Sequence, residues 1–327
     1  MTKVVLGITT YGPIPRVELL IKSIEKTIDP DISYIIAVAD DSAGGGYDMR
    51  ARKVFYKQKN IALLAGETIT GIPASWNRIV TFAKQQNAQI VVILSDGIRF
   101  LVPGWLQRMV HFLETNTQVG TVGTPTVGQP SFDSMLERWD HPVGRVGCAV
   151  GCSFAFRTEV AGKVKNVDGT TGFWEDLISF HEELDFGFSL SQQGYLSYML
   201  PYPPSYYRGG LAFAAHDELI WRSPSQYLPL EEFLIYARLS PWHVPQYEEN
   251  YAQGKVDKMS YSRVMFAKKW KLLEEIQGGN RFQVIAGRDT DILAEPQIPV
   301  HHQVVTPWPA REITWLDRNG QEKKSIV

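Results

Sequence analysis

Cysteine is scarce in this chain of 327 residues, which contains only Cys148 and Cys152. Small secreted domains that depend on disulfides are much richer in cysteine, so the count argues against a disulfide scaffold. Two thiols by themselves also fall short of the ligands that a structural zinc site needs. We therefore expect both cysteines to be small core residues, because free cysteine is among the most often buried residue types.

Long apolar runs and an excess of one charge are also missing. No uncharged apolar stretch approaches the ~20 residues that a membrane-spanning helix needs. The amino-terminal MTKVVLGITTYG lacks the long apolar core of a signal peptide. With 33 basic and 35 acidic residues the formal net charge is −2, so no global positive field attracts nucleic acid or anionic membranes. We expect a soluble, cytoplasmic protein with no integral membrane contact.

Two common nucleotide-binding fingerprints are absent. No Gly-x-Gly-x-x-Gly follows the first expected strand, and no Gly-Lys-Ser or Gly-Lys-Thr occurs. The usual nicotinamide and P-loop sites are therefore not expected. A nucleotidyltransferase would normally carry a Gly-rich loop with Arg or Lys after the first strand, and Thr9-Thr10-Tyr11-Gly12 has no basic residue. If a nucleotide binds, a different kind of loop must hold it.

The first half of the chain alternates between apolar runs that predict strands and amphipathic stretches that predict helices. The expected strands cover residues 4–8, 34–38, 61–64, 89–94 and 119–122. Helices are expected to begin at Pro15, Pro73 and Pro103, since proline is tolerated in a first helical turn. This order is typical of an α/β fold with a mostly parallel sheet flanked by helices. Residues 125–150 lack clean periodicity and are expected to be rich in loops.

Polar residues stand where the expected strands end. Thr9 and Tyr11 follow the first strand, Asp41 follows the second, and Asp96 follows the fourth. Ligands of parallel sheets bind at the carboxyl ends of the strands, so these positions predict a site. Each acid also suits a turn after a strand. Asp40 beside Asp41 leaves that assignment open by one residue.

Four segments, in this order along the chain, resemble the family 2 glycosyltransferases and their relatives of GT-A fold. The segments are Ile8-Thr9-Thr10-Tyr11 with the strand ending at Asp41; Gly71-Ile72-Pro73-Ala74-Ser75-Trp76-Asn77; Val92-Ile93-Leu94-Ser95-Asp96 with Pro103-Gly104-Trp105-Leu106; and Gly172-Phe173-Trp174-Glu175-Asp176 with Glu182-Glu183-Leu184-Asp185 and Gly194-Tyr195. The resemblance covers about residues 3–200. It implies a GT-A nucleotide-sugar-binding and catalytic domain at 1–217, a Rossmann-like α/β fold. Residues 218–327 then form a C-terminal extension of helices and short strands, with acceptor binding as its candidate role.

The resemblance implies a donor site for a nucleotide-sugar, with uridine diphosphate as the expected carrier. Asp41 corresponds to the acid that accepts a hydrogen bond from the nucleobase imide. Thr9 and Tyr11 would offer backbone groups and a stacking face, with loop packing as the alternative. Gly71 allows close backbone approach, and Asn77 lies one turn into the helix whose N-terminus suits a diphosphate. For Asn77 an ordinary helix-surface position stays open.

A divalent cation, Mn²⁺ or Mg²⁺, is the implied cofactor, since it offsets the charge that develops on the leaving diphosphate. Asp96 corresponds to the family's acidic metal motif and would also face the donor phosphates. This chain has only Ser95-Asp96-Gly97 where the family usually shows two or three acids. His216 is the expected second metal ligand, and an ordinary loop histidine is the alternative.

Three carboxylates lie within four positions at the expected start of a helix. By position, the resemblance makes Glu183 the general base of an inverting transfer, although the family has the shorter Asp there. Glu182 and Asp185 are expected as further acids of the site, either favourable at a helix N-terminus or in contact with the acceptor. All three could instead merely open a helix. Glu175 and Asp176 form a rival acidic pair.

The sequence does not identify the acceptor. The candidates are a glycan, a lipid-linked sugar, a protein and a modified nucleic acid. Trp174 is the candidate acceptor-binding ring, with core packing as the alternative. The segment 268–271 (KKWK) combines charge and an aromatic residue, but a solvated helix face is its simpler interpretation. Two alternative functions stay open. One is a non-catalytic carbohydrate- or partner-binding module on a decayed GT-A fold, which the single acid Asp96 permits, and the other is a nucleotidyltransferase of similar fold.

Overall fold

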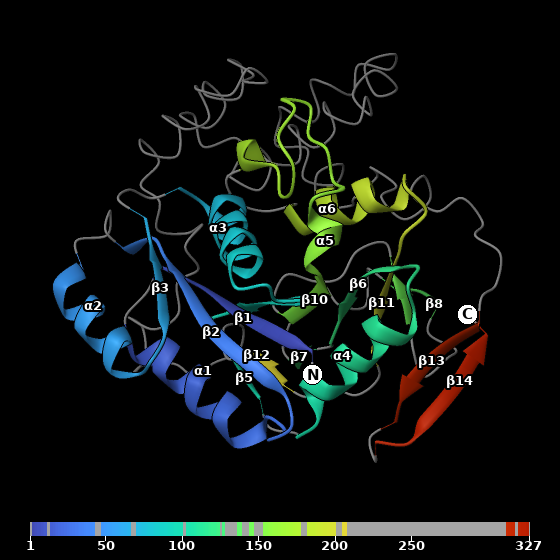
Figure 1. The fold of residues 1–327 in the computed structure, drawn as a ribbon, viewed down its shortest axis with the longest axis horizontal. Coiled ribbons are helices and arrows are strands. Elements are labelled where there is room, and N and C mark those ends of the chain that lie inside the picture. The colour runs from blue at the N-terminus through green and yellow to red at the C-terminus, as the bar shows by residue number, and fades with distance from the viewer. Residues whose placement is uncertain are drawn as a thin grey trace, which may run out of the picture.

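A computed structural model of the chain shows a central sheet with helices on both of its faces (Figure 1). The structure describes residues 2–11, 14–42, 47–66, 70–100, 103–124, 126–127, 136–138, 144–146, 153–177, 182–200, 205–207, 312–317 and 320–326. Cys148, Cys152 and residues 218–311 of the expected C-terminal extension lie outside these ranges.

The central sheet is nine-stranded in the described residues, in the order β3-β2-β1-β4-β10-β6-β11-β9-β8. Its strands are β1 (Lys3–Thr10), β2 (Ser33–Asp40), β3 (Ala62–Ala65), β4 (Ile90–Ser95), β6 (Val119–Gly123), β8 (Leu136–Arg138), β9 (Gly144–Val146), β10 (Ser153–Arg157) and β11 (Leu196–Met199). Strands β3, β2, β1 and β4 are parallel, whereas β10 runs antiparallel to its neighbours β4 and β6. The predicted α/β fold, a sheet with a run of parallel strands flanked by helices, is confirmed.

The helices divide between the two faces of the sheet (Figure 1). They are α1 (Ile14–Thr27), α2 (Met49–Gln58), α3 (Ile72–Gln85), α4 (Trp105–Thr115), α5 (Thr158–Ala161) and α6 (Glu182–Ser191), with a 3₁₀ turn, η3, at Glu175–Leu177. Alternate β1 side chains point to opposite faces, as the pleat requires. Leu6 packs with the apolar residues of α1 and α4, whereas Val5 packs with those of α3, α5 and α6.

Helix α3 lies unusually close to β1. A Cβ atom added at Gly7 would stand 2.4 Å from Cγ2 of Ile79, so glycine is the residue that allows this approach. The middle of α3 is thereby packed directly against β1.

An aromatic cluster fixes α6 and the segment before it over the sheet. The cluster contains Trp76, Phe154, Phe156, Phe173 and Phe186. Phe173 stacks on Phe186 of α6 with ring centroids 4.3 Å apart, and it meets Trp76 of α3 edge-on at 4.9 Å. Such pairs add stability beyond the area that they bury. The first turn of α6 therefore has a defined place relative to α3.

The remaining described strands form two small sheets. One joins β5 (Ile98–Phe100), β12 (Ser205–Tyr207) and β7 (Thr126–Val127), and the other is the hairpin of β13 (Glu312–Leu316) and β14 (Glu322–Ile326). The hairpin packs on α4, where the Asn116 amide donates to the Thr314 carbonyl at 2.8 Å. Ile313 and Trp315 are buried in the same core cluster as α1. The domain boundary expected at residue 217 stays a prediction, but these late strands complete the core of the first domain.

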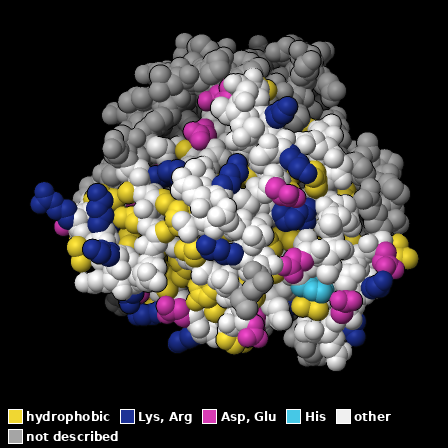
Figure 2. All heavy atoms as spheres, viewed as in Figure 1, with side chains coloured by type: hydrophobic (Ala, Val, Ile, Leu, Met, Phe, Trp, Pro, Cys, Tyr) yellow, Lys and Arg dark blue, Asp and Glu magenta, His cyan; other side chains and the backbone are white. Residues whose placement is uncertain are grey.

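The surface mixes charges of both signs. Figure 2 shows Lys and Arg side chains interspersed with Asp and Glu on the visible face. Within the described ranges, no helix has the length and apolar character that crossing a bilayer requires.

Candidate functional site at the carboxyl ends of the strands

The carboxyl ends of β1, β2 and β4 meet at one edge of the sheet. Thr9 of β1 pairs with Ala39 of β2 and with Ser95 of β4. The backbone N–H of Asp41 donates to the Thr10 carbonyl at 3.0 Å. The polar residues that follow these three strands in the sequence are therefore neighbours in space, at the edge where parallel sheets bind ligands.

The Asp41 carboxylate connects the end of β2 to the start of α3. It is 5% exposed and accepts hydrogen bonds from the backbone N–H groups of Thr70 and Gly71, both at 3.2 Å, and from the Ser75 hydroxyl at 3.1 Å. Arg78 forms an ion pair with it. Gly71 has a φ of 89°, which glycine adopts without steric cost. So many donors give the carboxylate a fixed orientation at this edge.

Asp40 has a different role from its neighbour. It is fully buried and accepts from Arg52 Nε at 2.6 Å, from the Tyr56 hydroxyl at 3.1 Å and from the Ser42 N–H at 2.9 Å. Burial, and then the charge of Asp40, raise the pKa of Tyr56 above its ordinary value of 10.0. Asp40 thus connects β2 to α2, whereas Asp41 connects β2 to the start of α3. The two acids, which the sequence could not tell apart, therefore have different partners.

Asp96 is buried at the end of β4 with both of its carboxylate oxygens engaged. Oδ2 accepts from the Thr10 hydroxyl at 2.7 Å, and Oδ1 pairs with Nη2 of Arg16 at 2.9 Å. The side chains of Arg16 and Asp96 are each 3% exposed. A strong ion pair between α1 and the sheet therefore holds the acid that the sequence predicts to bind metal.

This arrangement does not fit a divalent cation. Mn²⁺ and Mg²⁺ take several oxygen ligands, and a cation at Asp96 would stand beside the positive charge of Arg16, which already pairs with this carboxylate. In the part of the chain that the structure describes, no three His, Cys, Asp or Glu side chains gather so as to hold a metal. His216 lies outside that part. The roles of Asp96 and His216 as metal ligands, and of Asp96 at the donor phosphates, stay predictions.

Thr9 and Tyr11 make their contacts inside the protein. The Thr9 hydroxyl accepts from the indole N–H of Trp76 at 2.9 Å, which ties β1 to α3. Tyr11 is only 6% exposed. Thr9 lies within β1, whereas Tyr11, directly after that strand, fits the loop-packing alternative. Contact of either residue with a donor stays a prediction.

Asn77 joins α3 to the segment before α6, so it is more than a helix-surface residue. Its Nδ2 donates to the Phe173 carbonyl at 2.8 Å and to the Glu175 carboxylate at 2.9 Å, and its Oδ1 accepts from the Phe173 N–H at 2.9 Å. Gly172 has a φ of 97°, and a Cβ there would lie 2.6 Å from Asn77 Oδ1. The amide therefore positions the segment that leads to the acids of α6. Its contact with a donor stays a prediction.

The three acids of α6 stand in its first turn. Glu182 is 5% exposed, Asp185 is fully buried and Glu183 is half-buried. Burial, and secondarily the charge of Glu183, raise the pKa of Glu182 well above its ordinary value of 4.5. Within the described residues, Oε2 of Glu182 has no hydrogen-bond partner. A solvated helix start would expose these side chains, so the geometry favours an acid–base site.

The aromatic residue next to this segment is in the core. Trp174 has no exposed surface, so its ring is covered by protein, as the core-packing alternative predicts. Glu175 of the rival acidic pair is engaged by Asn77. An acceptor contact of Trp174 stays a prediction.

Sequence reasoning missed Arg16 and Arg78, and it identified Gly172 only as part of a motif. A signal existed for Arg16, because it precedes Leu20 by four residues and so lies on the apolar stripe of α1, where a charge needs a buried partner. For Arg78 and Gly172 no sequence signal identifies the partner, since each contact depends on how α3 is placed.

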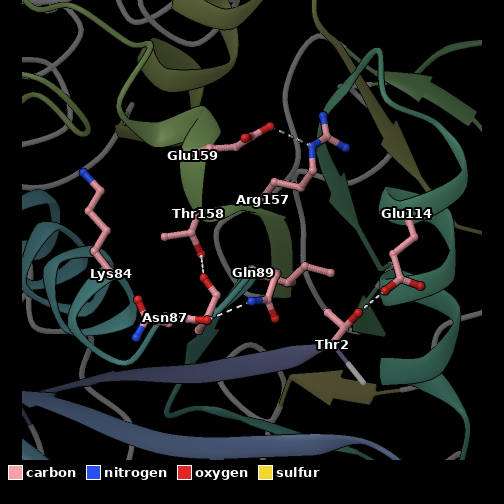
Figure 3. Close-up of a pocket in the computed structure, with 10 residues that line it drawn as sticks. Thr2, Lys84, Asn87, Gln89, Glu114, Arg157, Thr158 and Glu159 are labelled. Atoms are coloured by element: carbon pink, nitrogen blue, oxygen red, sulfur yellow. Dashed lines mark hydrogen bonds and ion pairs between the residues drawn. The ribbon is translucent and has the colours of Figure 1, made fainter.

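A pocket of about 540 Å³ lies at the opposite edge of the sheet, near the start of β4 (Figure 3). It is lined by Thr2, Lys84, Asn87, Ala88, Gln89, Ile90, Glu114, Arg157, Thr158 and Glu159. The Arg157 guanidinium donates to the carbonyls of Leu113 and Thr117, both at 2.8 Å, and so caps the end of α4. This pocket is separate from the edge where Asp41 lies.

No protein-family model and no curated protein matches the sequence. Solved structures match its fold. The crystal structure of GalNAc-T7 with UDP, GalNAc and Mn²⁺ aligns with a TM-score of 0.52 at 11% identity, over 100% of this chain and 64% of that chain. The chain has the GT-A fold.

Two other glycosyltransferase structures align less closely with this GT-A chain. S. aureus TarS 1-349 in complex with UDP-GlcNAc gives a TM-score of 0.47 at 18% identity, over 73% of this chain and 65% of that chain. Mannosyltransferase PcManGT from Pyrobaculum calidifontis, in complex with GDP-Man and Mn²⁺, gives 0.44 at 14% identity, over 92% and 81%. The chain spans less than two thirds of the length of the GalNAc-T7 and TarS structures.

Proposed function

We propose that the chain is a glycosyltransferase that moves a sugar from a UDP-sugar donor to the hydroxyl of an acceptor. The observation that carries the proposal is a chain of contacts that links three features, two of them at the carboxyl edge of the sheet. These are the fixed carboxylate of Asp41, the N-terminus of α3 at Gly71, and the buried acids of α6. Asn77 and the stack of Phe173 on Phe186 connect the second feature to the third.

Asp41 and the start of α3 form the proposed donor site. A carboxylate accepts a hydrogen bond from the imide N–H of uracil and rejects bases that lack a donor there. The N-terminus of α3 carries the partial positive charge that attracts a diphosphate. The GalNAc-T7 structure of the same fold contains UDP, which agrees with this assignment. Thr9 and Tyr11 would border the site at the end of β1.

Glu183 is the proposed general base. It takes the proton of the acceptor hydroxyl while that oxygen attacks the anomeric carbon of the sugar. The bond from this carbon to the diphosphate oxygen breaks, and UDP leaves with the bonding electrons, so a single displacement inverts the anomeric centre. Glu182 binds a proton more readily than an ordinary glutamate, and its protonation lowers the repulsion beside Glu183. Asp185 is fully buried in the same first turn of α6.

A bound divalent cation would offset the charge of the departing diphosphate. The GalNAc-T7 structure contains Mn²⁺. In the described part of this chain both oxygens of Asp96 are held by Thr10 and Arg16, so no step proposed here depends on a cation. A glycan, a protein or a modified nucleic acid all remain candidate acceptors, and the segment 268–271 lies outside the described residues.

The test measures release of UDP from a panel of UDP-sugars, with water and simple glycosides as acceptors, together with calorimetric binding of UDP. Glu183→Gln should lower turnover about 100-fold or more, because a positioned general base contributes about 10²–10⁴-fold. UDP should still bind this variant with nearly unchanged affinity, since Glu183 acts on the acceptor.

Glu175→Gln and Glu159→Gln serve as comparisons. Glu175 is the rival acid, and Glu159 is an exposed glutamate at the opposite edge of the sheet. Loss of turnover in Glu175→Gln with retention in Glu183→Gln would transfer the base role to Glu175. Absence of binding by UDP and by every other nucleoside diphosphate would contradict the proposed function and favour a non-catalytic binding module.

A further inference from the structure

Asp96 is the acid that the resemblance assigns to a cation, yet in the structure it is half of a buried ion pair. Its Oδ1 lies 2.9 Å from Nη2 of Arg16, and its Oδ2 accepts from Thr10 at 2.7 Å. Both members of the pair are almost fully shielded from water. The positive charge beside this carboxylate is therefore supplied by the protein.

The origin of the pair lies in the start of α1. Arg16 shares the inward stripe of α1 with Leu20 and Ile24, so the helix carries its guanidinium toward the sheet. Thr10 at the end of β1 fixes the other oxygen. A cation that bound Asp96 would compete with Arg16 for the same carboxylate and would place two positive charges side by side in a buried position, which is unfavourable.

We propose that Arg16 withholds Asp96 from divalent cations, so that nucleoside diphosphate binding by this protein does not require Mn²⁺ or Mg²⁺. Because Arg16 neutralises Asp96, the end of β4 does not repel an incoming diphosphate. The N-terminus of α3 then supplies the remaining attraction. Arg16 acts here as a positioning residue, and the inference rests on the proposed function in presupposing that a nucleoside diphosphate binds.

The first experiment is a calorimetric titration of the full chain with UDP, in the presence of a chelator and again with Mn²⁺. For the wild type, the two dissociation constants should agree within about threefold, a difference of less than 1 kcal/mol, because no divalent cation takes part in binding. Electron paramagnetic resonance of Mn²⁺ without nucleotide should show no protein-bound ion at the same concentrations.

The second experiment removes the charge of Arg16. Arg16→Met keeps an apolar stem on α1 and leaves Asp96 as an uncompensated acid. It should weaken UDP binding in chelator about tenfold or more, and Mn²⁺ should restore that loss. The Mn²⁺ resonance should now report a bound ion. Arg16→Lys, which keeps the charge, should behave more like the wild type.

The matched control is Arg52→Met, which breaks a second buried arginine–aspartate pair in the described residues, between Arg52 and Asp40. It should cost stability, as measured by thermal unfolding, without creating a bound Mn²⁺. If Arg16→Met binds Mn²⁺ and Arg52→Met does not, the Mn²⁺ binding is due to the exposed charge of Asp96. A general loss of stability would not explain it. If Arg16→Met does not fold, the wild-type titrations and Arg16→Lys still decide the matter.

The outcomes separate the two proposals. Wild-type binding of UDP that requires Mn²⁺ and is lost in Asp96→Asn would overturn the inference and leave the proposed function standing. Failure of every nucleoside diphosphate to bind, with and without Mn²⁺, would overturn the proposed function. In that case a protein-bound Mn²⁺ in the wild type would independently contradict the role given to Arg16.

Discussion

At the scale of single residues, burial distinguishes acids that look alike in the sequence. Asp40 and Asp41 are adjacent, but one is paired with Arg52 inside the fold and the other receives its donors from the start of α3. Glu182 and Glu183 differ in the same way, because only Glu182 is buried. The residue type shows that each of these side chains can ionise, and its burial and partners decide which role it can have.

Glu182 carries a pH-dependent cost to stability. Burial and Glu183 raise its folded-state pKa well above 4.5, so the folded protein binds a proton that the unfolded chain releases at lower pH. Stability is therefore complete below about pH 4.5, the unfolded value, and falls as pH rises through the folded pKa. Glu182→Gln should raise the free energy of unfolding at pH 7 and change it little at pH 4, as measured by chemical denaturation.

The comparison for this experiment is Glu159→Gln, whose side chain is 71% exposed. It should leave the pH profile of stability as it is in the wild type. A stabilisation by Glu182→Gln that is equal at pH 4 and pH 7 would contradict the assignment, because a neutral amide mimics the protonated acid.

At the scale of elements, the contact between α3 and the segment before α6 depends on one glycine. Gly172→Ala combines a φ of 97° with a Cβ only 2.6 Å from Asn77 Oδ1. Gly169 offers a matched control, since its φ is 83° and no atom lies within 4 Å of its added Cβ. Gly169→Ala should lower the free energy of unfolding by about 1 kcal/mol, the cost of the backbone conformation alone.

Gly172→Ala should lower the free energy of unfolding by about 2–4 kcal/mol, because overlap with Asn77 adds to the backbone cost. Denaturant titrations of both variants measure the difference. An equal loss of unfolding free energy in the two variants would show that Asn77 moves aside freely. The Asn77 amide would then not be what positions α6.

The elements also show how far the sequence could predict the fold. β1, β2, β4, α1 and α4 were predicted because each is long enough to display an apolar period. β7, β8 and β9 have two or three residues, too few for alternation to appear. The docking of β13 on α4 was not predicted, because it rests on contacts such as that of Asn116 with Thr314, which are far apart in the chain.

The candidate site was predictable to the same extent. The rule that parallel strands present their carboxyl ends together placed Thr9, Asp41 and Asp96 correctly at one edge. It could not state which partners each side chain takes there. The pairing of Arg16 with Asp96 depends on the angle at which α1 crosses the sheet, and no local pattern encodes that angle.

At the scale of the whole molecule, the two edges of the sheet differ in chemistry. The carboxyl edge holds the fixed Asp41, the start of α3 and, through Asn77, the approach to α6. The opposite edge holds the pocket of Figure 3, whose Arg157 is used to cap α4. Lys84 and Glu159 at that pocket bring charges of both signs, which gives no preference for an anion.

Hydrogen–deuterium exchange with and without saturating UDP tests this division. UDP should slow exchange about tenfold or more in residues 40–42 and 70–77, because the ligand orders these segments and binding stabilises only the bound form. Residues 84–90 and 157–159 at the opposite edge should exchange as they do without ligand. Inorganic phosphate at equal concentration is the control, and it should protect less, since it has no base for Asp41 to bind. Protection confined to residues 84–90 and 157–159 would place the nucleotide in the pocket of Figure 3, and the donor site assigned to Asp41 and α3 would then be wrong.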